Sequence, residues 1–196
     1  MPRDLQAHEA LIIALLALIL ALAVACGGDG GDRTGIPEVD GIIDAVLSED
    51  ADTLIDLVVY EQVKCGDENG LDSPFPPHCP PGQPEGTLTA ALSSGVCKAL
   101  FVARHEVPEW VRSLLVQTDL VVYAVYRSES VPDLDGDYTI VFNSASPQEA
   151  PPGIQTVSIA EGHILSLTSS CGSLEQLIQS LEESGAVAVL PSSAPD

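Results

Sequence analysis

Basic residues are scarce in this chain, which has seven Lys and Arg against 29 Asp and Glu and a formal net charge of −22. A nucleic-acid-binding surface needs clustered cations that displace counterions from phosphates, so the composition excludes this function class. An acidic surface also resists lying flat on anionic lipid. Solubility is the simplest role of the charge, and attraction of cations or of a basic partner is the alternative.

Motifs that carry catalysis are also missing. The chain has no Gly-x-Ser-x-Gly elbow, and no glycine-rich phosphate loop follows a strand. His105 stands beside Glu106, but the second histidine of a His-Glu-x-x-His zinc motif is absent. We therefore assign no catalytic residue and no cofactor, and expect a non-enzymatic protein.

Charge is absent from the 16 residues Ala10–Ala25, which are built almost entirely of Ala, Leu, Ile and Val. As a helix this run would cover roughly 24 Å, less than the hydrocarbon core of about 30 Å. A short apolar run at an N-terminus is typical of an export signal, which we assign to residues 1–25. The stretch after it, "CGGDGGDRTG", is polar and rich in glycine and predicts a flexible tether over residues 26–35.

The junction "LAVAC", Leu22 to Cys26, resembles the lipobox of bacterial lipoproteins. The resemblance implies that the Cys26 thiol receives a diacylglyceryl group and that the chain is cut before it. Several acyl chains on one residue anchor a protein stably in a bilayer, on the extracytoplasmic face. An uncleaved membrane anchor and an ordinary signal cut at Ala25 are the alternatives.

Four cysteines remain after Cys26: Cys65, Cys79, Cys97 and Cys171. An even number in an exported chain predicts two disulfides, with three possible pairings. We favour Cys65–Cys79, which would clasp a proline-rich loop, and Cys97–Cys171. A four-cysteine zinc site is the alternative, although the chain has no Cys-x-x-Cys pair.

Helical periodicity marks the beginning and the end of the folded part. Apolar spacing predicts a helix over Ile36–Leu47 and a second from Thr53 to about Tyr60, capped by Asp52. "PEWVRSLLV" (108–116) predicts a short helix, and a Ser-x-x-Gln capping box at Ser173 opens a helix that ends at Gly185.

Between these helices the pattern changes. Cys65–Gly86 contains six prolines and predicts a long loop, and Thr87–Arg104 fits a helix or a strand. Further runs rich in β-branched and aromatic residues predict an antiparallel meander, its last two strands joined by "AEGH". The predicted strands are Leu120–Tyr126, Tyr138–Phe142, Ile154–Ile159 and His163–Thr168. We expect one α+β domain over residues 36–190, followed by a flexible tail, residues 191–196.

Two stretches, "VDGIIDAVLSEDADTLIDLV" and "TVSIAEGHILSL", resemble the cystatin-like cone of the nuclear-transport-factor-like superfamily. The resemblance implies N-terminal helices packed on a curved antiparallel sheet that wraps a pocket. The leading hypothesis is a domain that binds a small ligand or another envelope protein. An enzyme of the cyclase or isomerase type, with an Asp–His or Tyr–Asp set inside the cone, and a purely structural domain are the alternatives. Trp110, Tyr123 and Tyr126 are candidates to line a pocket or to fill the core.

"DLDGDY" offers Asp133, Asp135 and Asp137 at the spacing of the first three ligands of a calcium loop. Tyr138 occupies the position that needs glycine, and Ser144 the position that needs a bidentate glutamate. We therefore expect an acidic turn here, with a weak Ca²⁺ site as the alternative.

Overall fold

The computed structural model describes residues 33–66, 75–96, 99–116, 120–128, 136–144, 154–170 and 173–190. From Thr34 onward these residues belong to one structural unit that combines helices with a mixed β-sheet, which confirms the expected α+β class. No helix in these ranges has the length and apolar character needed to cross a bilayer. Residues 1–32, where the export signal, Cys26 and most of the tether are predicted, lie outside the described part, as does the predicted tail, residues 191–196.

The first described helix, α2 (Pro37–Leu47), begins one residue later than predicted. Pro37 suits the first turn because its missing N–H would have no partner there. Asp40 accepts hydrogen bonds from the Thr34 N–H and hydroxyl, both at 2.8 Å, and this fixes the chain entering the helix. One face of α2 is buried in the core, through Val39, Ile42, Ile43, Ala45 and Val46.

The second helix, α3 (Ala51–Asp56), differs from the prediction at both ends. Its N-cap is Asp50 rather than Asp52, because the Asp50 carboxylate accepts a hydrogen bond from the Thr53 N–H at 3.1 Å. The helix also ends before Tyr60, since Val58 leaves it to form a bridge with Ile164 in the sheet.

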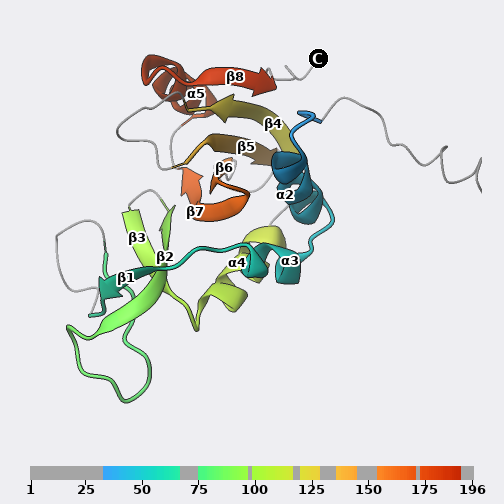
Figure 1. The fold of residues 1–196 in the computed structure, drawn as a ribbon. Helices are drawn as coiled ribbons and strands as arrows, with labels where there is room; N and C mark the ends of the chain where they lie inside the picture. Colours follow the sequence, from blue (N-terminus) through green and yellow to red (C-terminus); the bar gives the residue numbers. More distant parts are fainter. Residues whose placement is uncertain are drawn as a thin grey trace, which may run out of the picture. The chain divides into compact units, whose positions relative to one another are not determined.

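Eight strands form a single sheet in the described part of the chain. They are β1 (Glu61–Lys64), β2 (Leu88–Val96), β3 (Ala99–Ala103), β4 (Leu120–Arg127), β5 (Tyr138–Ser144), β6 (Ile154–Ala160), β7 (His163–Ser170) and β8 (Val187–Leu190). Their order is β1-β2-β7-β6-β5-β4-β8, and β3 pairs with β2 outside this path (Figure 1). The predicted antiparallel meander is confirmed as β4 to β7. The expectation of a wholly antiparallel sheet is wrong, because β2 and β7 run parallel.

The ambiguous segment, residues 87–104, forms the antiparallel pair β2 and β3. The short strands β1 and β8 were not predicted. Both have four residues, none of which is buried, so neither displays the alternation of buried and exposed positions by which strands are recognised.

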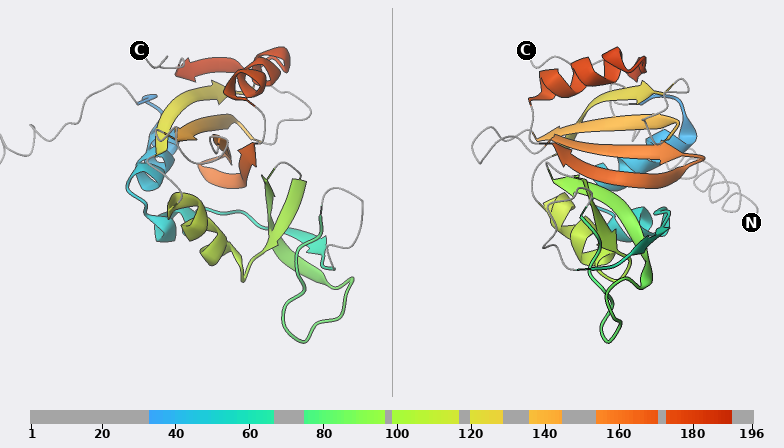
Figure 2. Two further views of the ribbon diagram at one scale, coloured as in Figure 1. Left: turned by 180° about the vertical axis from the view of Figure 1, so that it is seen from behind. Right: turned by 90° about the vertical axis from the view of Figure 1, so that its left-hand side faces the viewer.

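Helices cover both faces of the sheet. The larger core cluster lies between one face and α2, α3 and α4 (Val107–Val116), and it contains Phe142, Ile140 and Ile159. The smaller cluster contains Ala124, Val141 and Leu181, and it joins the opposite face of β4 and β5 to α5 (Leu174–Glu183). Figure 2 shows α5 beside β4 and β8. Because side chains alternate between the two faces of a strand, β4 and β5 each supply both clusters.

Two local predictions near the C-terminus are confirmed. The β6–β7 turn has positive φ at Glu161 (51°) and Gly162 (75°), as a tight hairpin requires. Ser173 and Gln176 form the predicted reciprocal capping box of α5, and Gly185 follows that helix with φ 88°.

Candidate functional site

A small cavity of about 20 Å³ lies in the described core beneath α2, α3 and α4. The side chains around it are all hydrocarbon: Val46, Leu54, Val111, Leu114, Leu115, Phe142, Val157 and Leu167. An Asp–His or Tyr–Asp set, which the cone resemblance implies for an enzyme, is not among these described lining residues.

A larger hollow of about 410 Å³ lies between α4, β3 and the segment that ends at Cys79. We call it the Trp110 groove. Its walls are Pro76 and His78 from the loop, Leu100, Phe101 and Val102 from β3, and Glu106, Glu109, Trp110 and Ser113 from α4 and the residue preceding it. Its size falls within the range of small-ligand sites, about 300–1,000 Å³.

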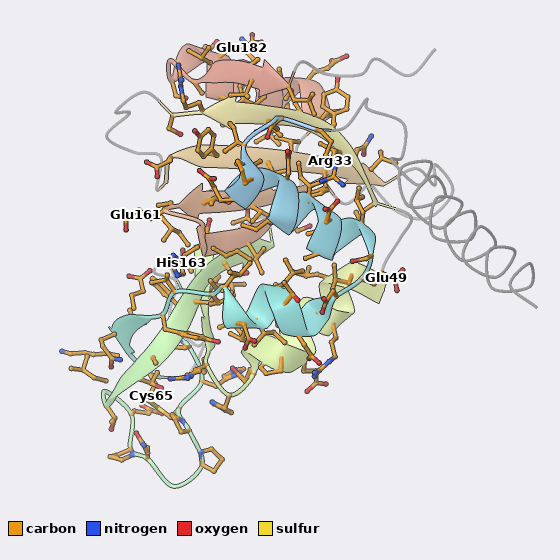
Figure 3. The ribbon with its side chains drawn as sticks, turned by 45° about the vertical axis from the view of Figure 1, so that its right-hand side comes forward. Arg33, Glu49, Cys65, Glu161, His163 and Glu182 are labelled. Carbon is orange, nitrogen blue, oxygen red and sulfur yellow. A yellow bond between two sulfur atoms is a disulfide. The ribbon has the colours of Figure 1, made fainter. Side chains whose placement is uncertain are left out.

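The loop wall of the groove is held by a covalent bond and by main-chain contacts. The predicted Cys65–Cys79 disulfide is present, with a sulfur–sulfur distance of 2.02 Å, and Figure 3 labels Cys65. Because Cys65 no longer has a free thiol, a four-cysteine zinc site is contradicted. The Phe101 N–H donates to the Phe75 carbonyl oxygen at 3.0 Å, which ties the loop to β3. Proline has no N–H to donate to a neighbouring strand, so the disulfide and this hydrogen bond hold the loop in place of regular strand pairing.

An imidazole and a carboxylate meet at the rim of the groove. His78 Nδ1 lies 2.8 Å from Glu106 Oε1, and the two side chains are 55% and 35% exposed. Sequence reasoning missed this pair because the partners are 28 residues apart and Glu106 has another histidine, His105, directly before it. The spacing of Cys65 and Cys79 was the available signal, since the clasp brings His78 to α4.

Trp110 is partly buried against the larger core cluster and forms one wall of the groove. Its Nε1 atom is buried and has no hydrogen-bond acceptor among the described residues. The chain has a single tryptophan, so its fluorescence reports on this groove alone. The Glu109 side chain, also in the wall, is exposed.

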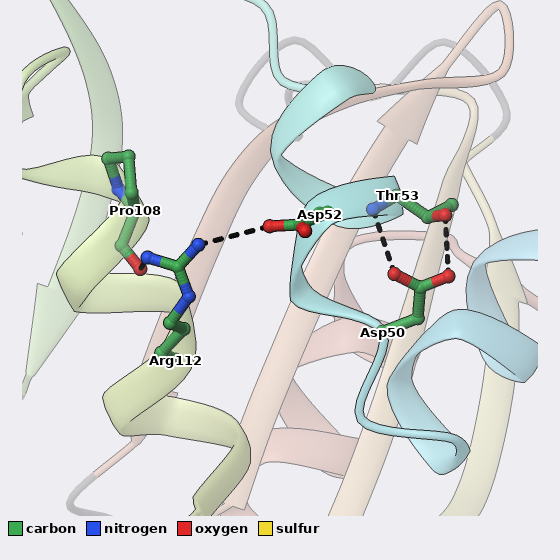
Figure 4. A network of polar contacts seen from close by, with 5 residues as sticks. All are labelled: Asp50, Asp52, Thr53, Pro108 and Arg112. Carbon is green, nitrogen blue, oxygen red and sulfur yellow. Dashed lines mark hydrogen bonds and ion pairs between the residues drawn. The ribbon is translucent and has the colours of Figure 1, made fainter.

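An exposed ion pair between Arg112 and Asp52 joins α4 to α3 (Figure 4). Arg112 donates from one guanidinium nitrogen to Asp52 Oδ1 at 3.0 Å and from the other to the Pro108 carbonyl oxygen at 3.5 Å. The Thr53 hydroxyl and N–H both donate to Asp50, and these hydrogen bonds lower the pKa of that carboxyl.

The calcium-loop candidates and the remaining cysteines form no site in the described part of the chain. Asp137 Oδ2 accepts a hydrogen bond at 3.1 Å from the N–H of Glu161, in the β6–β7 turn. No group of three or more potential metal ligands occurs in the described ranges. Asp133 and Asp135 lie outside those ranges, as do Cys97 and Cys171.

The remaining candidates lie away from the Trp110 groove. Tyr123 and Tyr126 pack with α5, on the opposite face of the sheet. Burial raises the pKa of the Tyr126 hydroxyl, with smaller contributions from Glu182 and Tyr123. His163 is exposed, with its Nδ1 atom 3.0 Å from the Glu161 carbonyl oxygen.

The Trp110 groove therefore combines apolar walls with the ring of Trp110, two carboxylates and an imidazole. Comparison of the chain with protein-family models, with curated proteins and with solved structures gave no match in any of the three.

Proposed function

We propose that this chain is an exported, lipid-anchored binding protein and that the Trp110 groove is its binding site. The observation that carries the proposal is the contrast between two hollows. The interior one measures about 20 Å³ and is lined by hydrocarbon, whereas the groove measures about 410 Å³ and joins apolar, aromatic and charged side chains. A specific site typically has this mixture of an apolar lining and a few polar groups.

We also propose that the domain has the cystatin-like cone architecture. Its support is the order of the elements: two leading helices and α4 pack against one face of a sheet that ends in a four-strand antiparallel meander. An enzyme acting inside such a cone would need a carboxyl and an imidazole or phenol in the interior. The hydrocarbon lining of the interior cavity gives no support to that alternative.

The lipid anchor and the second disulfide are parts of the same proposal. The anchor is supported by the "LAVAC" junction at Cys26. For the second disulfide, Val96 and Ser169 are paired in the parallel β2–β7 ladder. The ladder thus joins the two chain segments directly before Cys97 and Cys171. Two disulfides are consistent with the oxidising compartment that export would give.

Mass spectrometry of the intact protein from a bacterial host tests the anchor. We expect an N-terminus at Cys26 that carries acyl groups, and a mass lower by four hydrogens than that of the same acylated chain after reduction. A chain that keeps residues 1–25 without acyl groups would overturn the anchor, and four titratable thiols would overturn the disulfides.

Ligand screening by ¹⁹F NMR tests the groove. The full chain is labelled with 5-fluorotryptophan, which gives one resonance because Trp110 is the single tryptophan. We expect members of a library of neutral and charged fragments and short peptides to shift this resonance saturably. Ser113→Phe, which fills the groove from α4, should abolish the shift, whereas Gln179→Phe on the exposed side of α5 should leave it. A resonance that no compound shifts, or shifts that persist in Ser113→Phe, would overturn the groove as the binding site.

A further inference from the structure

We infer that the occupant of the Trp110 groove is a segment of a partner protein that inserts a lysine or arginine side chain. This inference rests on the proposed function, because it assigns a ligand class to the same site. It follows from three features of the groove: its acidic walls, its open form, and the Trp110 indole N–H that makes no hydrogen bond with a described residue.

The charge of the groove is acidic. Its nine described wall residues include two carboxylates and one imidazole, and no lysine or arginine occurs among them. Glu106 already lies 2.8 Å from His78, whereas the exposed Glu109 carboxylate has no hydrogen bond or ion pair with any described residue. Glu109 is therefore available to a basic group, which would gain a charge-assisted hydrogen bond.

Two arginines near the groove do not fill this role. Arg112 is on α4, and it donates to Asp52 of α3 and to the carbonyl oxygen of Pro108, one turn earlier in α4. Arg104 follows β3, and its guanidinium carbon lies 5.0 Å from the centre of the Tyr60 ring. These two described arginines thus contact residues that do not line the groove.

The hydrophobic walls suit the rest of a basic side chain. Lysine and arginine bury their methylene stems on apolar surface while the charged head stays near water. Leu100, Phe101 and Pro76 provide such surface, and the rings of Phe101 and Trp110 can attract a cation through their faces. Tryptophan and arginine are also the residue types most enriched at the energetic centres of protein interfaces.

The form of the groove favours a protein segment over a free small molecule. Small-molecule sites usually enclose most of their ligand, whereas this groove is open along the exposed Glu109 and His78 side chains. A peptide also carries carbonyl acceptors. Because Trp110 Nε1 makes no hydrogen bond among the described residues, turning the indole toward a peptide carbonyl breaks none there and gives the buried donor a partner.

Three matched peptides test the inference: acetyl-Ala-Val-Xaa-Val-Ala-amide with Xaa as Arg, Gln or Glu. The full chain in neutral detergent is titrated with each, and Trp110 fluorescence is recorded at low and at high salt. We expect the Arg peptide to bind at least tenfold more tightly than the Gln peptide, and this preference to shrink in salt. The Glu peptide should bind most weakly.

Variants locate the effect. Glu109→Gln should abolish the preference for Arg over Gln, and Glu175→Gln, which removes the same charge from the exposed side of α5, should preserve it. Trp110→Phe, followed by calorimetry, should weaken all three peptides and keep the Arg-to-Gln ratio.

Each contrary result overturns a distinct statement. Equal binding of the Arg and Gln peptides overturns the cationic side chain and leaves the groove as a binding site. Binding of an alkylguanidine without a peptide bond as tightly as the Arg peptide overturns the protein segment as occupant. If no peptide binds but fragments shift the labelled resonance, the inference is wrong and the proposed function stands; if neither acts on Trp110, both are wrong.

Discussion

Removing the Cys65–Cys79 clasp should lower the stability of the domain and open the Trp110 groove. The perturbation is the double substitution Cys65→Ser and Cys79→Ser. The bridge spans a sequence separation of 14, so it closes a loop of 15 residues. In the chain-entropy treatment, a cross-link of this length stabilises the folded state by about 3 kcal/mol.

Main-chain contacts determine how this loss is distributed. The Cys65 N–H donates to the Thr87 carbonyl oxygen at 2.9 Å, and the Gly86 N–H donates to the Cys65 carbonyl oxygen at 2.8 Å. These bonds close the base of the loop without the disulfide, so the pairing of β1 with β2 should survive. The loop wall keeps the Gly66 N–H to Pro77 carbonyl bond at 3.1 Å and the Phe101 N–H to Phe75 carbonyl bond at 3.0 Å. The disulfide, however, is attached directly after His78, so we expect His78 to move away from α4 when it is removed.

Urea unfolding, followed by Trp110 fluorescence and by far-ultraviolet circular dichroism, measures both effects. With a slope of about 1–3 kcal/mol per molar urea, a loss of 3 kcal/mol lowers the midpoint by about 1–3 M. The native emission of Trp110 should also shift to longer wavelength, because water gains access to the indole. Cys65 is 3% exposed, so the matched pair Cys65→Ala and Cys79→Ala separates burial of a hydroxyl from loss of the cross-link. An unchanged midpoint together with unchanged native emission would refute the reasoning.

Three other substitutions test local features. Gly136→Ala should lower the free energy of unfolding by about 1–3 kcal/mol, because at φ 117° the added Cβ would lie 2.7 Å from a carbonyl oxygen of β6. The control is Gly82→Ala, which also has positive φ (83°) but no atom within 4 Å of the added Cβ, and it should lower the free energy of unfolding less in the same urea assay. Asp50→Ala should lower the melting temperature at pH 7, because the Thr53 hydrogen bonds to this carboxylate are lost. These bonds lower the pKa of Asp50, and their contribution disappears as the carboxyl is protonated, so the difference in melting temperature from the unsubstituted chain should narrow below about pH 4. A difference that does not change with pH would contradict this. Burial raises the pKa of Tyr126 in the folded state, so the unfolded chain loses this proton first and folding stability should fall above about pH 10. In unfolding curves recorded at alkaline pH, Tyr126→Phe should lose less free energy of unfolding than the unsubstituted chain.

Sequence periodicity located most of the regular structure. The strands β4 to β7 and the helix α5 carry strong local signals, namely β-branched runs, a tight turn at Gly162 and the Ser173 capping box. Boundaries that depend on competition between neighbours were less predictable. Asp50 and Asp52 are both good N-caps by type, and Asp52 pairs with Arg112, 60 residues further along the chain.

The pairing of strands that are far apart in the chain could not be predicted from local sequence patterns. The parallel ladder of β2 and β7 joins Ser93 to Ser166, and a run of amino acids does not reveal which distant strand it will meet. The same limit applies to the site. The predicted Cys65–Cys79 clasp implied that the loop is held, but the docking of His78 beside Glu106 depends on where β3 and α4 lie.

The position of the Trp110 groove follows from the way in which the chain is held. Where helices pack on the sheet, branched aliphatic side chains such as Ile42 and Leu54 fill the interior, and a ligand would have to displace them. The proline-rich segment before Cys79 can form neither helix nor ladder, so it cannot close over β3 and α4 as a packed layer. A cross-link holds it nearby instead, and the incomplete packing leaves an open hollow with polar groups at its rim. A clasped irregular loop beside a helix thus creates an open hollow at the surface and leaves the core packed.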